Sequence, residues 1–250
     1  MKSLIFLVLS LFFGISYGQD VNSIIKEADL QVASMNDVPA INTYREALKL
    51  QPSNLYVLCQ CSELCSRIGG RLQHDKKEQA DYYAAAKTYA SEALQVNSLS
   101  SEANFVNALV MGTAALHGSG KEKIDAVKNI KRYADLAIKY DAKNYKAWYV
   151  LGKWYYEISN LNYFERTAVK IFYGPLPPAS IADAIRCFEK SKAINPRFVL
   201  NYLSLAKAYK KNDDQNTARQ NLQVMFTLPD KTQDDAGLKN EGRSLLKKWD

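Results

Sequence analysis

One spacing of large and small residues, repeated along the chain, most constrains how this sequence can fold. It is clearest in the stretch KAWYVLGKWYYEIS, which runs from Lys146 to Ser159. The spacing occurs at Trp148, Leu151, Gly152 and Tyr155, at Tyr202, Leu205, Ala206 and Tyr209, and at Leu58, Cys61, Ser62 and Cys65. Intervals of three and four residues place these side chains on one face of a helix. The pattern therefore predicts a recurring helix that packs through the same positions each time.

A second recurring pattern supplies the partner helix. Small residues, a ring and a closing proline follow at intervals of four, three and five, in Ala40, Tyr44, Ala47 and Pro52, and in Ala184, Phe188, Ser191 and Pro196. Weaker copies are Ala86, Ala90, Ala93 and Ser98, and then Ile130, Ala134, Ala137 and Ala142. A fifth copy, Ala218, Leu222 and Met225, begins 34 residues after Ala184. Small residues allow two helices to cross closely, and proline ends the second helix. Together the halves predict tetratricopeptide (TPR) hairpins.

The central copies are further apart than the TPR period of about 34 residues. We expect the excess in longer helices or in loops, with candidates at 69–79, 117–122 and 159–180. Segments 21–35 and 233–249 have helical apolar spacing and are expected to cover the ends of the array. No strand pattern is visible in the sequence. The predicted fold is all-α, a TPR-like right-handed α-solenoid of helical hairpins with insertions.

The longest insertion, residues 159–180, carries an apolar stripe of its own. Gly174 to Pro178 should break any helix, and Ser180 with Asp183 resembles a capping box that starts the next one. The stripe consists of Leu161, Phe164, Ala168, Ile171 and Phe172. We expect these side chains to pack back over the repeats. The alternative is that they line an apolar pocket that holds a lipid.

The first residues resemble an export signal. Lys2 precedes an apolar stretch from Leu4 to Phe13, and Ser16-Tyr17-Gly18 forms a small-x-small cleavage site before Gln19. We therefore expect a signal peptide over 1–18, a single TPR-like domain over 19–250, and a protein exported to the periplasm or cell envelope. An uncleaved membrane anchor is the alternative.

Export raises the question of disulfides, because the chain has four cysteines. Three of them lie in the stretch CQCSELC, and within a regular helix their geometry suits neither a bridge nor a tetrahedral metal site. We expect Cys59, Cys61, Cys65 and Cys187 to be small core residues, with their pairing left open.

The aromatic residues divide between core and surface. By repeat register, Trp148, Tyr155, Tyr202 and Tyr209 are expected to be buried. A candidate ligand-binding groove on the concave face consists of Lys146, Tyr149, Lys153, Tyr156, Leu203, Lys207 and Lys210. Lysines interleaved with tyrosine suit an acidic peptide or a phosphate. A solvated lysine face is the alternative reading.

Other classes of protein fit the sequence poorly. The formal net charge is +7, but the lysines are spread along the chain without a dense block, which argues against nucleic acid as a partner. No G-x-S-x-G, H-E-x-x-H or P-loop motif is present, and His74 and His117 fall in predicted connections. The adjacent pair Glu165 and Arg166 is expected to hold a loop. We therefore expect neither catalysis nor a metal or cofactor.

Several motifs together resemble the regulator of microtubule dynamics family of TPR-like proteins. They are Trp148-x2-Leu151-Gly152-x-Trp154, Phe164-Glu165-Arg166, Gly174-x-Leu176-Pro177-x-Ala179-Ser180, Ala184-Ile185, Asn201-Tyr202 with Leu205-Ala206-Lys207, and CSRIGGR from Cys65 to Arg71. The resemblance runs from about residue 35 to 249. It implies non-catalytic helical-repeat proteins associated with microtubules, with organelle tethering and, in some members, with lipid binding.

The function expected from these observations is a non-catalytic scaffold that binds a protein or peptide through its concave face. The alternative is a lipid-binding or membrane-tethering helical repeat, with a phospholipid as the ligand. Association with microtubules is expected only if the chain is not exported.

Overall fold

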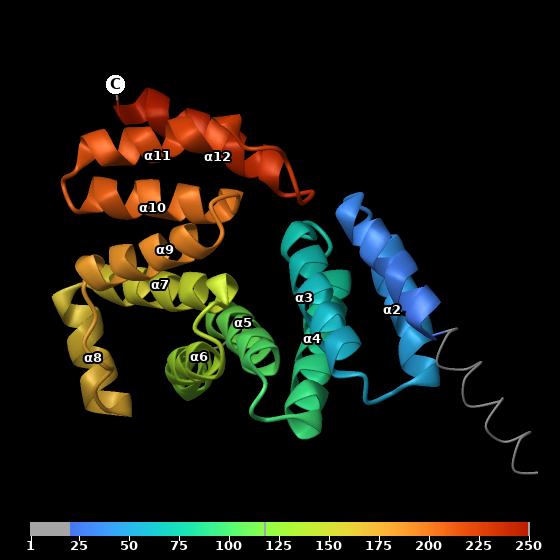
Figure 1. Cartoon of the computed structure of the whole chain (residues 1–250). Helices are drawn as coiled ribbons and strands as arrows, with labels where there is room; N and C mark the ends of the chain where they lie inside the picture. The colour runs from blue at the N-terminus through green and yellow to red at the C-terminus, as the bar shows by residue number, and fades with distance from the viewer. Residues whose placement is uncertain (1–20, 118, 250) are drawn as a thin grey trace, which may run out of the picture. The chain divides into compact units, whose positions relative to one another are not determined.

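A computed structural model describes residues 21–117 and 119–249 (Figure 1). The expected signal peptide, residues 1–18, lies outside the described residues. Helices joined by short turns make up the described chain, and no strand occurs within it. The prediction of an all-α fold is confirmed. The chain divides into two compact units, residues 1–96 and 97–250. A single repeat domain over 19–250 stays a prediction.

The first unit is a series of helices that pack on their neighbours in sequence. A helix through residues 21–33 is followed by α2 (Asp37–Leu50), α3 (Leu55–Arg71) and α4 (Lys76–Val96). α2 packs against α3, and α3 packs against α4. Asp37, at the start of α2, is fully buried and pairs with Arg67 and Arg71 near the end of α3, at 2.6 Å and 2.7 Å. These ion pairs tie opposite ends of the two helices together.

The second unit contains the remaining helices. They are α5 (Ser101–His117), α6 (Gly120–Tyr140), α7 (Tyr145–Asn160), α8 (Tyr163–Tyr173), α9 (Ile181–Ile194), α10 (Val199–Lys211), α11 (Gln215–Thr227) and α12 (Asp235–Trp249). The hairpin pairs are α5 with α6, α7 with α9, and α10 with α11. Within this unit α7, α9, α10 and α11 stack one upon the next, and α12 covers α10 and α11 (Figure 1).

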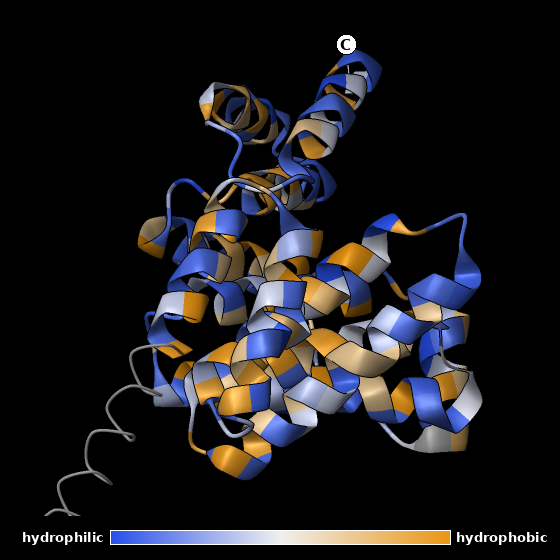
Figure 2. Cartoon of the chain, turned by 90° about the vertical axis from the view of Figure 1, so that its right-hand side faces the viewer, coloured by the Kyte–Doolittle hydropathy of each residue, from blue (hydrophilic) through white to orange (hydrophobic). Residues whose placement is uncertain are grey.

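The repeat register predicted from the small residues is confirmed. Ala184, Phe188 and Ser191 of α9 are all fully buried. The hydroxyl of Ser191 donates a hydrogen bond of 2.8 Å to the carbonyl of Tyr145, which fixes α9 against the start of α7. Hydrophobic residues recur among hydrophilic ones along the helices, as the colours of Figure 2 show. This amphipathic pattern lets each hairpin bury one side against the next.

The prediction for the aromatic residues of the repeats is wrong in part. Tyr202 is buried, but Trp148, Tyr155 and Tyr209 are only half-buried. The indole N–H of Trp148 donates to the carbonyl of Ala142 at 2.9 Å, so this ring covers the α6–α7 turn. The buried indole of α7 belongs instead to Trp154, which donates to the carbonyl of Val127 at 2.8 Å and so joins α7 to α6.

The extra residues between repeats are found mainly in helices. α4 and α6 each contain 21 residues, and the connection at 72–75 is short. In the third insertion, residues 159–180, the extra residues form α8, which lies in the chain between α7 and α9, the two helices of one hairpin. The expectation that its apolar side chains pack over the repeats is wrong, because Phe164, Ile171 and Phe172 are 81%, 70% and 74% exposed.

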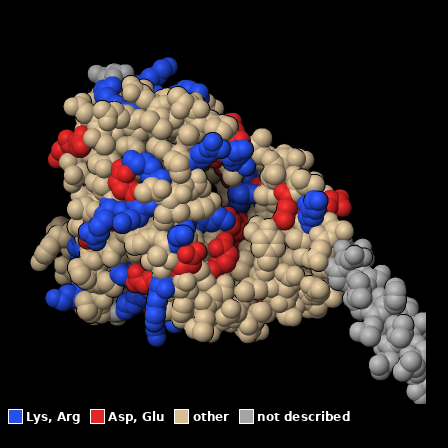
Figure 3. Space-filling view, in the orientation of Figure 1, with Lys and Arg blue, Asp and Glu red and all other residues tan. Residues whose placement is uncertain are grey.

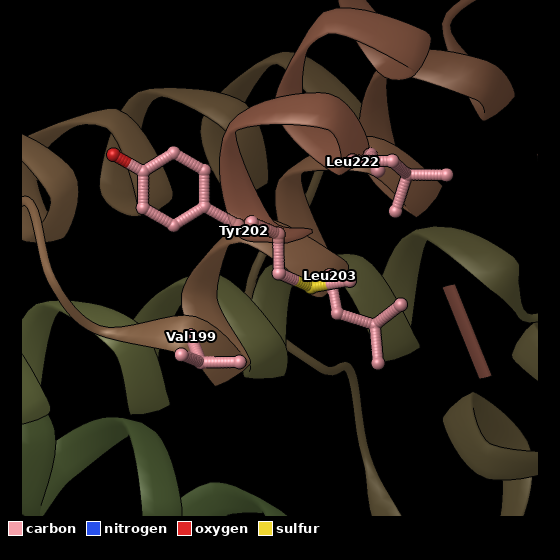
Figure 4. Close-up of a cluster of buried hydrophobic side chains, with 6 residues drawn as sticks. Val199, Tyr202, Leu203 and Leu222 are labelled. Carbon is pink, nitrogen blue, oxygen red and sulfur yellow. The ribbon is translucent and has the colours of Figure 1, made fainter. Parts of the chain in front are cut away.

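The C-terminal hairpin has a well-defined core. Buried residues of α10 and α11 pack together, and Leu238, Leu245, Leu246 and Trp249 of α12 lie against them, as expected of a terminal helix. Tyr202 and Leu203 leave α10 in different directions, with Leu203 on the side of Leu222 (Figure 4). Among the described residues, no helix combines the length and the hydrophobicity that crossing a bilayer would require.

Candidate binding surface on α7 and α10

The predicted groove residues lie on two helices that the fold brings together. Lys146, Tyr149, Lys153 and Tyr156 lie on α7, whereas Leu203, Lys207 and Lys210 lie on α10. Both helices pack against α9, and they also contact each other. The hydroxyl of Ser204 on α10 lies 3.5 Å from that of Tyr149 on α7. Residues about 50 positions apart in the sequence therefore form one surface.

Each predicted lysine has a partner within the chain. Lys146 lies 3.7 Å from Glu102 of α5, Lys153 lies 2.6 Å from Glu157, and Lys207 lies 2.6 Å from Glu241 of α12. Lys210 donates to the side-chain oxygen of Gln215 at 2.6 Å, and its ammonium lies 5.8 Å from the centre of the Trp249 ring. The surface is therefore not a row of isolated cations. It carries positive and negative charges side by side.

Five residues of α7, α10 and α12 lie near one another, and we refer to them as the central cluster: Tyr149, Lys153, Glu157, Lys207 and Glu241. The ring of Tyr149 is half-buried, with its centre 5.7 Å from that of Phe188 and 5.2 Å from that of Phe198. Burial raises the pKa of Tyr149; Ser204 and Lys153 act to lower it, and Glu157 and Glu241 act to raise it further. Tyr149 therefore remains a neutral hydroxyl with charges of both signs around it.

Lys153 of the central cluster is accessible to a ligand and interacts with its neighbours. Its side chain is 48% exposed. Desolvation by the surrounding protein acts to lower the pKa of Lys153, but the hydrogen bond to Glu157 and the influence of Tyr149 outweigh it, and the pKa is raised. Its ammonium also lies 5.6 Å from the centre of the Tyr156 ring. Lys153 is therefore charged at neutral pH, with Glu157 and Tyr149 beside it.

Leu203 and Lys146 do not join the central cluster. Leu203 is only 2% exposed and belongs to the core between α10 and α11, so its side chain is not available to a ligand. Lys146 turns towards α5, where its ammonium lies 5.4 Å from the centre of the Phe105 ring. The candidate surface is therefore smaller than the set of residues predicted from the sequence.

Sequence reasoning missed the two carboxylates of the central cluster. Glu157 follows Lys153 by four residues on the same helix, and this spacing is a signal for an ion pair. Glu241 follows Lys207 by 34 residues and reaches it only because α12 folds back over α10. No local pattern in the sequence indicates that second contact.

The cysteines behave as core residues, as expected. All four are buried free thiols. Burial raises the pKa of Cys65 to about 11 and that of Cys187 to about 12, and it also raises the pKa of Cys61. These thiols are therefore protonated at neutral pH and are poor nucleophiles. Within residues 21–117 and 119–249, no group of three or more His, Cys, Asp or Glu side chains is arranged to hold a metal ion.

Comparison with known proteins identifies relatives along most of the chain. A family model described as "Regulator of microtubule dynamics protein 1-3" matches residues 24–250. The chain is 27% identical over 195 residues to regulator of microtubule dynamics protein 1 of Caenorhabditis elegans, covering 78% of this chain and 84% of that protein. It is 27% identical over 175 residues to regulator of microtubule dynamics protein 3 of Xenopus laevis, covering 70% of this chain but only 37% of that longer protein.

Solved structures show the same fold at low sequence identity. A thermophilic TPR protein of Thermus thermophilus superposes with a TM-score of 0.65 and 11% identity, covering 90% of this chain and 98% of that one. The pilF protein of Pseudomonas aeruginosa gives a TM-score of 0.55 and 12% identity, covering 93% and 86%. The fold predicted from the repeat pattern is thus that of TPR proteins.

Proposed function

The chain belongs to the regulator of microtubule dynamics family, and on this premise we propose that it is a non-catalytic scaffold that binds a protein segment across α7 and α10. The observation that carries the proposal is the central cluster. Its side chains come from three helices and combine a tyrosine ring with two cations and two anions. TPR folds typically bind extended peptides on surfaces of this kind, where several weak contacts act together.

The ion pairs of the lysines support a ligand with charges of both signs. An acidic residue of a partner would compete with Glu157 for Lys153, or with Glu241 for Lys207, and each such exchange leaves a carboxylate of this chain free to pair with a basic residue. Because exposed ion pairs contribute only about 0.2–1 kcal/mol each, a ligand needs several. We therefore propose a peptide with acidic and basic residues in alternation, rather than a purely acidic one.

The non-catalytic part of the proposal has two supports. The thiols are buried and protonated, which removes the cysteines as nucleophiles. The relatives are named as regulators, and the similar solved structures are TPR proteins.

Where the protein acts is a further part of the proposal. The amino-terminal sequence supports export, in which case the partner is a protein of the periplasm or cell envelope. The names of the relatives support a second candidate, a role in microtubule dynamics, for a chain that remains inside the cell.

The proposal is tested by affinity capture with a matched pair of variants. Lys153→Glu/Lys207→Glu reverses both cations of the central cluster. Lys143→Glu/Lys190→Glu makes the same change in net charge at exposed positions in the α6–α7 turn and on α9. We expect the first variant to lose a partner that the wild type and the second variant both retain. If the two variants capture the same proteins in the same amounts, the central cluster is not the binding surface.

A further inference from the structure

The inserted helix α8 exposes an apolar face to solvent. Phe164, Ala168, Ile171 and Phe172 follow the intervals of one helical face, and all four side chains are exposed. Among the described residues, the most exposed aromatic side chains are Tyr163, Phe164 and Phe172, at 77%, 81% and 74%. Soluble proteins rarely leave neighbouring large apolar side chains in water, and such patches usually mark contact sites.

The exposed face does not reflect a poorly formed helix. Asn162 and Glu165 form a reciprocal capping box at the start of α8, with hydrogen bonds of 3.0 Å and 2.8 Å. The guanidinium of Arg166 donates to the carbonyl of Ile158 at 2.6 Å and to that of Leu161 at 3.1 Å, which fastens α8 to the end of α7. Gly174, with a φ of 80°, ends the helix in a conformation that suits glycine. The helix is therefore anchored through its polar groups, and its apolar face stays exposed.

The helix beside α8 is basic. α8 packs against α6, which has more cations than anions. The exposed cations of α6 are Lys121, Lys123, Arg132 and Lys139, and its exposed anions are Glu122, Asp125 and Asp135. α8 itself carries Arg166 and Lys170, while the carboxylate of Glu165 is engaged in the capping box. Lys and Arg side chains are visible on the lower left of Figure 3, where α6 and α8 lie, with Asp and Glu side chains beside them.

We propose that α8 docks on an anionic membrane surface, with Phe164, Ile171 and Phe172 in the boundary between headgroups and acyl chains. Amphipathic helices with aromatic and aliphatic side chains on one face and basic residues nearby bind membranes in this way. α6 packs against α8, and packed helices lie about 8–10 Å apart. Cations of α6 near this contact therefore lie within the distance of about 10 Å over which a surface potential acts. This mode of docking requires no membrane-spanning helix.

The size of the face favours a membrane over a second protein. An 11-residue helix is about 16 Å long at a rise of 1.5 Å per residue. A stable protein–protein interface buries about 800 Å² on each partner, which is more than one face of such a helix offers. An interfacial helix, by contrast, needs only its own apolar face and the neighbouring charge.

The test is flotation of the full chain with lipid vesicles. Vesicles of phosphatidylcholine with phosphatidylglycerol are compared with vesicles of phosphatidylcholine alone, at low and high salt. We expect flotation with the anionic vesicles, weakened by salt, and a loss of about tenfold in Phe164→Ser/Ile171→Ser. Leu30→Ser/Leu99→Ser is the matched control, because it replaces two exposed leucines elsewhere and should float as the wild type does.

A second measurement, the emission of a fluorophore on α8, does not depend on the Phe164→Ser/Ile171→Ser variant. The four native thiols are buried, so a thiol-reactive fluorophore labels Ile171→Cys selectively. We expect its emission to shift to the blue with anionic vesicles, whereas the same label at Leu99→Cys should not shift.

Three results would overturn the proposal. One is a wild type that does not float with anionic vesicles, and another is a Phe164→Ser/Ile171→Ser variant that floats as well as the wild type. The third is a dimer, detected by light scattering, that the same two substitutions dissociate, because it would assign the face to a second copy of the chain. None of these results bears on peptide binding at the central cluster, which lies on α7, α10 and α12.

Discussion

The ring of Phe188 occupies the space that a side chain at position 152 would need. A Cβ added to Gly152 would lie 2.6 Å from Cδ1 of Phe188, which is closer than two carbon atoms approach without displacement. Gly152 lies on α7 and Phe188 on α9, the two helices of one hairpin. Their close approach is the physical reason why the repeat requires a small residue at this point.

Gly152→Ala should therefore destabilise the protein. Overpacking of a tight core typically costs about 1–3 kcal/mol, which exceeds the gain in helix propensity of up to about 1 kcal/mol from replacing glycine. Urea unfolding followed by circular dichroism measures the change. Gly112→Ala on α5 is the control, because a Cβ there meets no atom within 4 Å. It should stabilise slightly, and equal effects of the two variants would contradict the packing described.

Asp37 makes the free energy of unfolding of the first unit depend on pH. Burial alone would raise the pKa of Asp37, but the hydrogen bonds and charges of Arg67 and Arg71 outweigh it and lower the pKa. A carboxyl whose pKa is lower in the folded state adds stability above its unfolded pKa of about 4. That stability is lost as the pH falls through the lowered value. Unfolding at neutral pH and below about pH 4 should show this loss in the wild type.

Asp37→Asn should remove most of this contribution. It leaves two arginines without their buried partner, so we expect a loss of about 3 kcal/mol at neutral pH and a weaker dependence on acid. Glu46→Gln breaks the exposed pair with Lys49 and should cost no more than about 1 kcal/mol. A stable Asp37→Asn protein with an unchanged acid profile would refute the role assigned to these ion pairs.

The thiols provide a direct test of the core. Native protein should react slowly or not at all with a thiol reagent near neutral pH, because the four cysteines are buried and burial raises the thiol pKa values. Denatured protein without reductant should then release four reactive thiols. Two reactive thiols in place of four would show a disulfide and contradict the arrangement.

A charge swap separates binding from stability at the central cluster. Lys207→Glu/Glu241→Lys keeps an ion pair between α10 and α12 but reverses its direction. Because both side chains are partly exposed to solvent, the effect of the pair on stability should stay within about 1 kcal/mol. Partner capture should nevertheless fall as far as in Lys207→Glu alone. Recovery of capture in the swapped protein would mean that the pair acts only by holding α12 in place.

Local spacing was sufficient to predict the hairpins, because buried alanines and rings recur at fixed intervals along each helix. Ala184, Phe188 and Ser191 are buried as predicted. Local spacing did not predict the position of Trp148 correctly. Its indole donates a hydrogen bond to a carbonyl of the α6–α7 turn, and a half-buried ring of this kind occupies the same repeat position as a buried ring would.

Local spacing could not predict contacts between segments that are distant in the sequence. The apolar stripe of α8 is identical in pattern to one that packs, and only the structure shows that its side chains are exposed. In the same way, Glu241 reaches Lys207 through the folding of α12 over α10, which no interval in the sequence records.

Photo-crosslinking from the surface of α7 tests the proposed scaffold most directly. A benzophenone amino acid is placed at Tyr156, beside Lys153 of the central cluster, and in a second protein at Lys190, exposed on α9. The account predicts a covalent adduct with a partner protein from position 156 and none from position 190. An adduct from position 190 alone, or equal adducts from both positions, would contradict it.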